Sequence, residues 1–323
     1  MDVTSLGRED SWDGVRVLVV GFDPDGQSAA DNLLHLGAEV AILDPVARPE
    51  TGEFAELLNV LGADVLRGAG AEEPGIEWLA GRGWQLIIAT VEAAGHRVLK
   101  SVVELYPEAT VMSSLDLARQ IEPDQPWLLV GAAYAEDTNA TLIARAAAAM
   151  LRAGGVTAAP AGAGERTAME LVMEPERYDA LVVSVTPELL TLSGALRPQS
   201  TCVLVARPEL AAAFTDVERA CVYKPEEPVT EDMVREAEVI EGARAIGITR
   251  GTPGVGMLGV VEDVLCDRAF VEDRQNTAAE ICTLTDLARQ DDDYVESLLA
   301  SVALARAYGV ALAPIRAVIG ETF

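Results

Sequence analysis

The chain has 323 residues, which is enough for two domains that each bury a hydrophobic core. Its 52 acidic against 24 basic residues give a net charge of −28, which disfavours binding to nucleic-acid backbones and anionic membrane surfaces. No apolar run reaches the roughly 18 residues of a membrane span, and the N-terminus lacks the pattern of a secretory signal. We therefore expect a cytoplasmic, soluble protein.

The first predicted elements form a strand–helix–strand unit. A short run rich in β-branched residues at 15–20 ends at Gly21 and is typical of a buried parallel strand. A turn at 22–26 precedes a helical pattern at 27–36, and a second strand at 39–43 follows. This order predicts a βαβ opening of the nucleotide-binding type.

The glycine pattern after the first strand does not fit a dinucleotide. The pattern G-x-G-x-x-G needs a second glycine where this chain has Asp23, whose carboxylate would point toward a pyrophosphate. A dehydrogenase is therefore disfavoured. Asp44, at the tip of the second strand, has two equal interpretations: a ligand of a ribose hydroxyl or a solvated carboxylate at a strand end. The residues of the candidate nucleotide site are Gly21, Phe22, Asp23 and Asp44.

The alternation of strands and helices continues to a boundary rich in proline and charge. We predict strands at 63–66 and 85–89 and helices at 54–61, 96–105 and 115–121. The Glu-Pro-Asp-Gln-Pro stretch at 122–126 is the predicted boundary between the domains. The sequence thus predicts a Rossmann-like domain over 1–122 and a second α/β domain over 123–323.

The second domain opens with a buried-strand signal at 127–131 and an alanine-rich helix at 140–152. A P-loop would lie between them, with glycine N–H groups around phosphate, a lysine for the β- and γ-phosphates and a Ser or Thr for magnesium. The lysine position falls on Ala140, and Glu136 and Asp137 add negative charge. The degenerate loop comprises Gly131, Thr138, Asn139, Ala140 and Thr141, of which Thr141 alone is of a required type.

Other patterns favour ordinary structure. The glycine-rich stretch 251–256 lies between two strand-like runs with no helix after it, so we predict a plain turn. The acidic run 291–293 is best explained as the cap of a helix over 294–308. Four cysteines without C-x-x-C spacing predict buried free thiols, and a structural zinc site is not expected.

Three groups of motifs resemble one family. They are the opening 14–44, the stretches 126–154 and 177–183, and a C-terminal group at 220–223, 230–237, 242–247, 258–261, 267–275 and 303–310. Nearly the whole chain resembles a Mur ligase of the D-glutamate-adding type (MurD), most closely the actinobacterial branch. The resemblance implies a three-domain ligase: the first domain binds UDP-N-acetylmuramoyl-L-alanine, the second ATP and magnesium, and the third D-glutamate.

The chain departs from the family at the positions that carry the family's nucleotide- and metal-binding residues. The G-T-N-G-K-T loop aligns with 136–141, without its lysine or either glycine, and Gly162 stands at a family asparagine. Ser184 replaces a glutamate that helps hold magnesium, and Glu188 lies past a proline, where it should point elsewhere. The family segment with the D-H-L-D-x-H motif and the carbamylated lysine is largely deleted between 208 and 220. The chain stops at Phe323, where the family's C-terminal domain would begin.

These departures predict a pseudoenzyme, because loss of one strong electrostatic contact to a transition state costs about 10²–10³ in rate. We expect no cofactor, catalytic residue or bound metal. We expect instead a binding, regulatory or assembly role linked to peptidoglycan precursor synthesis, with a protein partner, a homo-oligomer or a UDP-N-acetylmuramoyl-type ligand. Two alternatives remain: an active ligase with displaced ligands or a domain supplied by another chain, and a UDP-sugar sensor.

Overall fold

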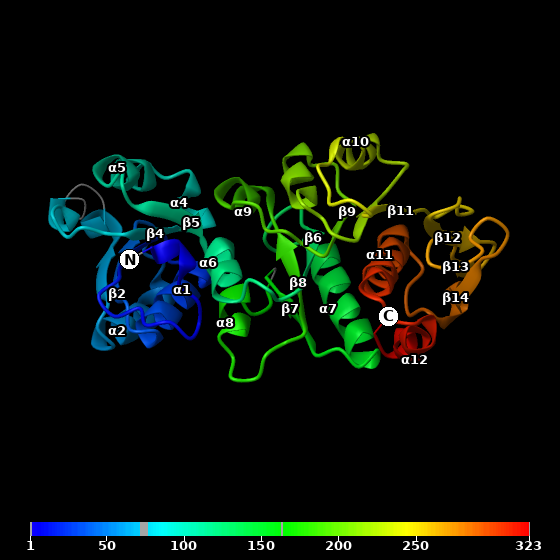
Figure 1. The fold of residues 1–323 in the computed structure, drawn as a ribbon, viewed down its shortest axis with the longest axis horizontal. Helices are drawn as coiled ribbons and strands as arrows, with labels where there is room; N and C mark the ends of the chain where they lie inside the picture. Colours follow the sequence, from blue (N-terminus) through cyan, green and yellow to red (C-terminus); the bar gives the residue numbers. More distant parts are fainter. Residues whose placement is uncertain (1, 72–76, 163, 323) are drawn as a thin grey trace. The chain divides into compact units, whose positions relative to one another are not determined.

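A computed structural model of the chain describes residues 2–71, 77–162 and 164–322 (Figure 1). The chain divides into two compact units that are discontinuous in sequence. The first unit comprises Met1–Asp124, Thr167–Pro175 and Thr191–Gly194, and the second comprises Gln125–Arg166, Glu176–Leu190 and Ala195–Phe323. The first change of unit, between Asp124 and Gln125, lies two residues after the end of the predicted first domain.

The first unit is built on a parallel sheet of five strands. The strands are β1 (Arg16–Val20), β2 (Glu39–Asp44), β3 (Asp64–Arg67), β4 (Leu86–Ala89) and β5 (Thr110–Ser113). Their order is β3-β2-β1-β4-β5, so the chain changes direction across the sheet between β1 and β4. Ligands of open parallel sheets bind at the carboxyl ends of the strands beside such a switch point.

The described helices of this unit lie before, between and after these strands, and the last of them lies in the later segment Thr167–Pro175. They are η1 (Val3–Ser5), α1 (Pro24–His35), η2 (Pro49–Thr51), α2 (Gly52–Val60), η3 (Gly68–Ala71), α4 (Val91–Ala94), α5 (Arg97–Leu105), α6 (Ser114–Ile121) and α8 (Ala168–Val172). Helix α1 begins at Pro24, within the stretch predicted as a turn, so the expected start at residue 27 is wrong. The reason is a cap: the Asp23 carboxylate accepts the Gly26 N–H, and proline occupies the first helical position.

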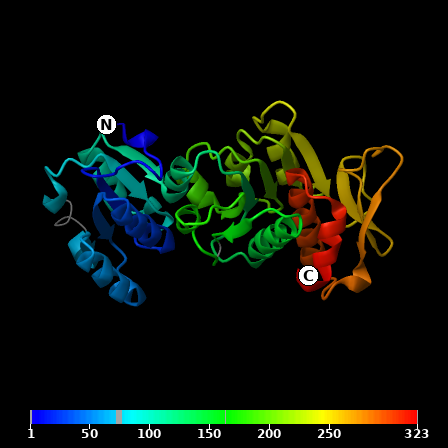
Figure 2. The ribbon, with the colours of Figure 1, turned by 60° about the horizontal axis from the view of Figure 1, so that its bottom comes forward.

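The second unit contains a mixed sheet of nine strands. They are β6 (Trp127–Gly131), β7 (Ala158–Ala161), β8 (Ala180–Val185), β9 (Ser200–Val203), β10 (Ala220–Tyr223), β11 (Arg244–Ile248), β12 (Met257–Val261), β13 (Val264–Asp267) and β14 (Ala279–Thr283). The order is β14-β13-β12-β11-β10-β9-β6-β8-β7. Pairing is parallel from β7 to β12 and antiparallel through β13 and β14, which are drawn in yellow and orange in Figure 2.

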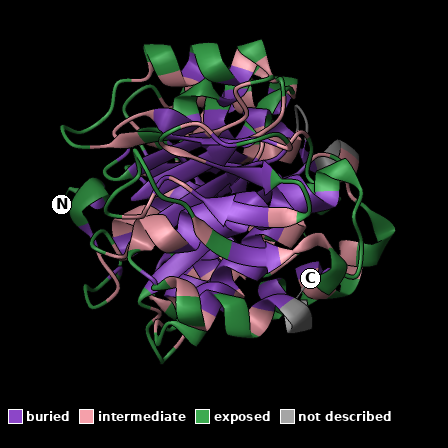
Figure 3. Cartoon of the chain, turned by 90° about the vertical axis from the view of Figure 1, so that its right-hand side faces the viewer, coloured by how far each residue is buried: buried purple, intermediate pink, exposed green. Residues whose placement is uncertain are grey.

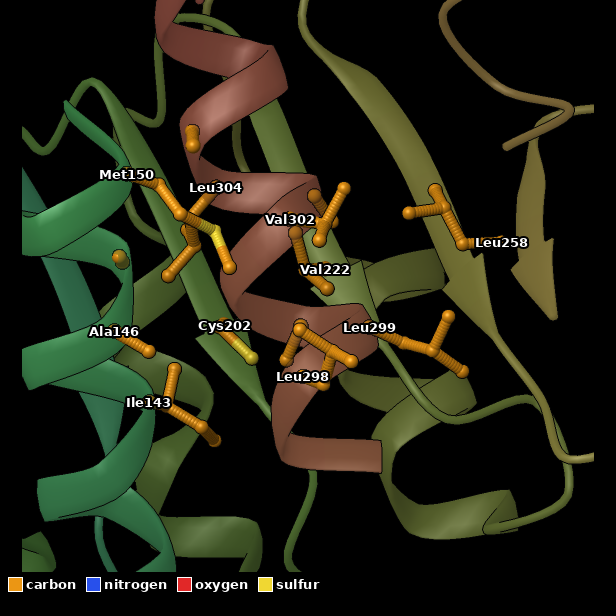
Figure 4. Packing of buried hydrophobic residues seen from close by; sticks show 14 of the residues in the cluster. Ile143, Ala146, Met150, Cys202, Val222, Leu258, Leu298, Leu299, Val302 and Leu304 are labelled. Atoms are coloured by element: carbon orange, nitrogen blue, oxygen red, sulfur yellow. The ribbon is translucent and has the colours of Figure 1, made fainter. Parts of the chain in front are cut away.

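Two long helices form the centre of this unit's core. Its helices are α7 (Thr138–Ala153), η4 (Pro208–Phe214), α10 (Pro228–Glu236), η5 (Leu284–Asp286), α11 (Asp292–Tyr308) and α12 (Leu312–Thr322), and α9 (Pro187–Leu192) begins in it. Figure 4 shows Met150 of α7 and Val302 of α11 packed beside Val222 of β10. Helix α11 is buried along most of its length, which explains its apolar and small residues.

Burial follows the strands, while exposed residues gather on helices and loops (Figure 3). The four cysteines are free and buried, as the sequence predicts. Burial raises the pKa of the Cys221 thiol to about 12, which keeps it protonated and unreactive near neutral pH. Among the described helices, none combines the length and the hydropathy needed to cross a bilayer.

Candidate functional site

The carboxyl edge of the first sheet begins with a tight turn after β1. Gly21 has φ +100°, and a Cβ atom there would lie 2.0 Å from Thr90 Oγ1. A Cβ on Gly26 would lie 2.4 Å from the Gly21 carbonyl oxygen, so helix α1 and the end of β1 approach closely. Phe22 is buried, and its backbone N–H donates to Glu92 Oε2 at 2.8 Å. The turn is therefore closed by a carboxylate from the segment after β4.

Asp23 caps two helices. Its Oδ1 accepts from the Gly26 N–H at 3.0 Å, and its Oδ2 accepts from the Glu92 N–H at 3.1 Å. Backbone N–H groups at the start of such a helix are the donors that a phosphate would use. Here the carboxylates of Asp23 and Glu92 already accept from the N–H groups of Phe22, Gly26 and Glu92. The expectation that Asp23 faces a pyrophosphate remains a prediction.

Asp44 forms a buried ion pair at the end of β2. It is 1% exposed, so the interpretation as a solvated strand end is wrong. Its Oδ1 accepts from the Ala47 N–H at 2.8 Å, and its Oδ2 accepts from Arg67 Nε at 2.7 Å. Arg67 also donates to the Arg48 carbonyl and to Thr51 Oγ1, which fixes its guanidinium. Both oxygens of Asp44 therefore have protein partners, and its role as a ribose ligand remains a prediction.

Asp25, in the first turn of α1, is expected to make the stability of the protein depend on pH. Burial raises the pKa of its carboxyl group from 3.8 to about 7, and the negative charge of Asp23 contributes to the rise. Between these two pH values the folded state holds a proton that the unfolded state has lost, so stability falls as pH rises.

Asp25→Asn is expected to remove this pH dependence of stability. Urea unfolding measures the decrease in the free energy of unfolding from pH 5 to pH 8. This decrease should be smaller in Asp25→Asn than in wild type or in Asp31→Asn, which is the control at an exposed site. Equal losses in all three would contradict the assignment.

In the second unit, a carboxylate lies among the N–H groups of the degenerate loop. Asp137 is 6% exposed and is the N-cap of α7. Its Oδ1 accepts from the Asn139 and Ala140 N–H groups at 3.0 and 3.2 Å, and its Oδ2 accepts from the Ala133 N–H at 2.9 Å. The cap starts the helix at Thr138, so the predicted start at residue 140 is wrong. The loop donors that a P-loop offers to phosphate are bound to this carboxylate.

Three other residues of the loop, Gly131, Asn139 and Ala140, line a small cavity together with Asp137. Ala140, at the lysine position, is buried, whereas Thr138 and Asn139 are exposed. The Thr141 hydroxyl, which matches the magnesium-binding position, donates to the Asp137 carbonyl oxygen at 2.9 Å. Gly131 ends β6 and has Val203 and Leu210 side-chain atoms within 3.2 Å of the position of an added Cβ.

A small cavity lies beside this loop. It has a volume of about 120 Å³ and is lined in part by Asp137, Lys224, Asp293 and Glu296. Lys224 Nζ lies 2.7 Å from Glu296 Oε1, so one of the chain's two lysines is already paired here. Drug-sized ligands occupy pockets of about 300–1,000 Å³. The cavity is therefore too small for a nucleotide without rearrangement.

Basic side chains that follow the neighbouring strands are likewise paired. Arg207, after β9, lies 3.8 Å from Glu188 Oε1 and 3.4 Å from Glu209 Oε2. Arg250, after β11, lies 3.2 Å from Asp292 Oδ1. The expectation that Glu188 points elsewhere than toward a metal is consistent with its approach to Arg207. The basic side chains of this edge thus have carboxylates of the same unit as neighbours, although the pairs of Arg207 and Arg250 are exposed to solvent and weak.

Ser184 lies on β8 at the position where the family resemblance implies a metal-binding glutamate. It is 5% exposed, and its hydroxyl has no hydrogen-bond partner within the described residues. A Cβ on Gly162 would lie 2.9 Å from the Ser184 carbonyl oxygen, so the neighbouring turn is close. Among the residues that the structure describes, no group of three or more His, Cys, Asp or Glu side chains could hold a metal. The serine hydroxyl, the paired lysine and the capped loop are not the donor set that a P-loop offers to ATP and magnesium.

Comparison with known proteins identifies the relatives. No family model matches the chain. It is 34% identical to the UDP-N-acetylmuramoylalanine--D-glutamate ligase of Streptomyces avermitilis over 95% of the chain and 66% of that relative. It is also 34% identical to the enzyme of the same name from Streptomyces coelicolor, over 94% of the chain and 66% of the relative. The chain therefore spans about two thirds of the length of these ligases.

A solved structure shows the same fold. The UDP-N-acetylmuramate:L-alanyl-gamma-D-glutamyl-meso-diaminopimelate ligase of Neisseria meningitides superposes with a TM-score of 0.60 at 13% identity. The superposition covers 95% of this chain and 97% of that structure. These relatives confirm the predicted family resemblance and the α/β fold class. The chain belongs to the Mur ligase family and is a MurD-like member of it.

Proposed function

We propose that this protein is a MurD-like pseudoenzyme that acts by binding, in the regulation or assembly of peptidoglycan precursor synthesis. The observation that carries the proposal is the position of the Asp137 carboxylate, which accepts three N–H groups of the degenerate loop. A triphosphate would have to displace this carboxylate and would meet its negative charge. The protein then requires neither ATP nor magnesium for its role.

Electrostatics supports the same proposal. Phosphoryl transfer depends on positioning and on neutralisation of the phosphate charge by lysine, arginine and metal ions. In this chain Lys224, Arg207 and Arg250 pair with carboxylates, and Ala140 stands where a P-loop lysine would be. A bound triphosphate would have to break several ion pairs before it gained any compensating contact. These observations favour a pseudoenzyme over an active ligase with displaced ligands.

The first unit gives less support to a UDP-sugar sensor. Its sheet order is of the nucleotide-binding type, but the turn N–H groups and both oxygens of Asp44 are engaged within the protein. The diphosphate of a UDP-sugar would compete with Glu92 for the Phe22 N–H. We therefore propose a protein partner or a homo-oligomer as the binding target.

Turnover tests the proposal. The chain is incubated with UDP-N-acetylmuramoyl-L-alanine, ATP, magnesium and D-glutamate, and ADP release is followed by a coupled assay. The expected rate equals that of the mixture without protein, because no group holds the transferred phosphate. The Streptomyces avermitilis relative in the same buffer is the positive control. ADP release that depends on both substrates and rises with the concentration of this chain would overturn the proposal.

A further inference from the structure

A groove lies between two short helices of the second unit. Helices η4 and α10 pack against each other, and Figure 1 labels α10. Between them is a groove of about 600 Å³. It lies within the size range of ligand-binding pockets, about 300–1,000 Å³. Its lining consists of an apolar floor and an acidic rim.

The apolar floor of the groove is formed by side chains of both helices and is shallow on the side of η4. Val229 and Met233 of α10 form one wall, with Met233 buried. The facing wall is Ala211 and Ala212 of η4, both exposed. An alanine side chain ends at Cβ, so the backbone of an incoming helix can approach such a surface closely, and helices pack at about 8–10 Å between axes. The groove therefore suits a helix that brings larger apolar side chains of its own.

The rim of the groove is acidic. Asp232, Glu236 and Glu238 line it, and no lysine, arginine or histidine does. Asp232 lies 2.5 Å from Arg235, which also pairs with Glu231. Within the described residues, neither Glu236 nor Glu238 forms an ion pair, and both are exposed. Two unpaired carboxylates beside an apolar floor favour a partner that combines apolar and basic side chains.

We propose that this groove binds a basic amphipathic helix of a partner protein. The inference rests on the proposed function, since a chain that acts by binding needs a surface for its partner. The nine residues of α10 span about 13 Å at 1.5 Å per residue, which matches two to three turns of a bound helix. Apolar residues at i and i+4 of that helix contact Met233, Val229 and Ala212, and its lysines or arginines face Glu236 and Glu238. The charge of a second copy of this chain disfavours it as the occupant of this groove, because it would bring another −28 and the same acidic rim.

A synthetic peptide tests the groove. The probe is a fluorescein-labelled helical peptide of about four turns, with leucine at i, i+4 spacing and lysine on the flanks. Its control has the same composition in scrambled order, so it has the same charge and no apolar face. In fluorescence anisotropy at physiological salt, we expect the amphipathic peptide to bind at least tenfold more tightly than the scrambled one.

Variants locate the binding. Ala212→Trp fills the groove at an exposed position, and Glu236→Lys with Glu238→Lys reverses the rim. Each change is expected to weaken the amphipathic peptide at least tenfold. The matched control is Glu53→Lys with Glu56→Lys on α2, which makes the same change in charge on exposed residues of the other unit and should leave affinity within about twofold. Circular dichroism checks that every variant keeps the wild-type helix content.

Three results would overturn the inference. Equal binding of both peptides, or equal weakening by the α2 control, would mean general attraction to an acidic chain. Self-association in sedimentation that Ala212→Trp abolishes would assign the groove to a second copy. None of these results bears on ADP release, so the proposed pseudoenzyme is tested separately.

Discussion

Replacing Asp44 with alanine is expected to lower the free energy of unfolding by about 3 kcal/mol, because it breaks a buried ion pair and leaves one charge uncompensated. Asp44 is 1% exposed, and the Arg67 side chain that it holds is 23% exposed. Because Arg67 is partly exposed, water can reach its guanidinium group after Asp44 is removed. The expected loss therefore falls at the lower end of the roughly 3–5 kcal/mol typical of broken buried pairs.

Urea unfolding followed by tryptophan fluorescence measures this effect. Asp44→Asn is the control, because an amide oxygen can still accept from the Ala47 N–H while the charge is lost. Its expected loss is smaller than that of the alanine variant. Calorimetry with a UDP-sugar on the same proteins separates the two roles of Asp44. Unchanged stability together with weakened UDP-sugar binding would contradict the structural role and restore the ribose-binding interpretation.

Asp137→Ala is expected to lower the free energy of unfolding by about 2 kcal/mol, since a helix N-cap contributes about 0.5–2 kcal/mol and an unpaired buried donor costs about 1–3 kcal/mol. The substitution removes the acceptor of three backbone N–H groups at the start of α7. Helix α7 packs extensively on α11, so the change affects the core of the second unit.

The matched control for Asp137 is another N-cap of the same unit. Asp291 caps α11 but is exposed and accepts from the Tyr294 N–H at 3.3 Å. Asp291→Ala should therefore cost about 0.5–1 kcal/mol, as a solvated cap does. Thermal unfolding and urea titration of both variants provide the comparison. An Asp137→Ala loss no larger than that of Asp291→Ala would show that the loop N–H groups find other acceptors and do not depend on Asp137.

Strands that are short, continuous apolar runs could be predicted from the sequence, whereas β7 and β14, with the sequences Ala-Ala-Pro-Ala and Ala-Glu-Ile-Cys-Thr, were not predicted. The strand at 127–131 was predicted with the bounds that β6 has, since all five residues are buried. Helix starts were less accurate. Asp23 and Asp137 start α1 and α7 three and two residues before the predicted positions, because a capping side chain fixes a helix terminus independently of its apolar pattern.

The contacts at the two candidate sites could not be predicted from spacing. Glu92 accepts from Phe22, which lies 70 residues earlier, and Lys224 pairs with Glu296 on a distant helix. For Glu92 the available signal was its place shortly after a predicted strand, at the edge where ligands of parallel sheets bind. Lys224 could have been singled out because the chain has only two lysines, but nothing in the sequence indicated that its partner is Glu296.

The two sheet edges share one physical feature. In each, carboxylates of the protein accept the backbone N–H groups that nucleotide-binding folds offer to phosphate: Glu92 and Asp23 in the first unit and Asp137 in the second. In the proposed pseudoenzyme, these carboxylates satisfy the N–H donors that a phosphate would otherwise accept from, so the loops keep their hydrogen bonds without a nucleotide.

Calorimetric titration of ATP with magnesium into the wild-type chain tests this claim most directly. We expect no magnesium-dependent heat of binding up to millimolar ATP, because Asp137 accepts from the N–H donors of the loop and Lys224 is paired with Glu296. Saturable binding in the micromolar range that requires magnesium and is lost in Thr141→Ala would contradict it.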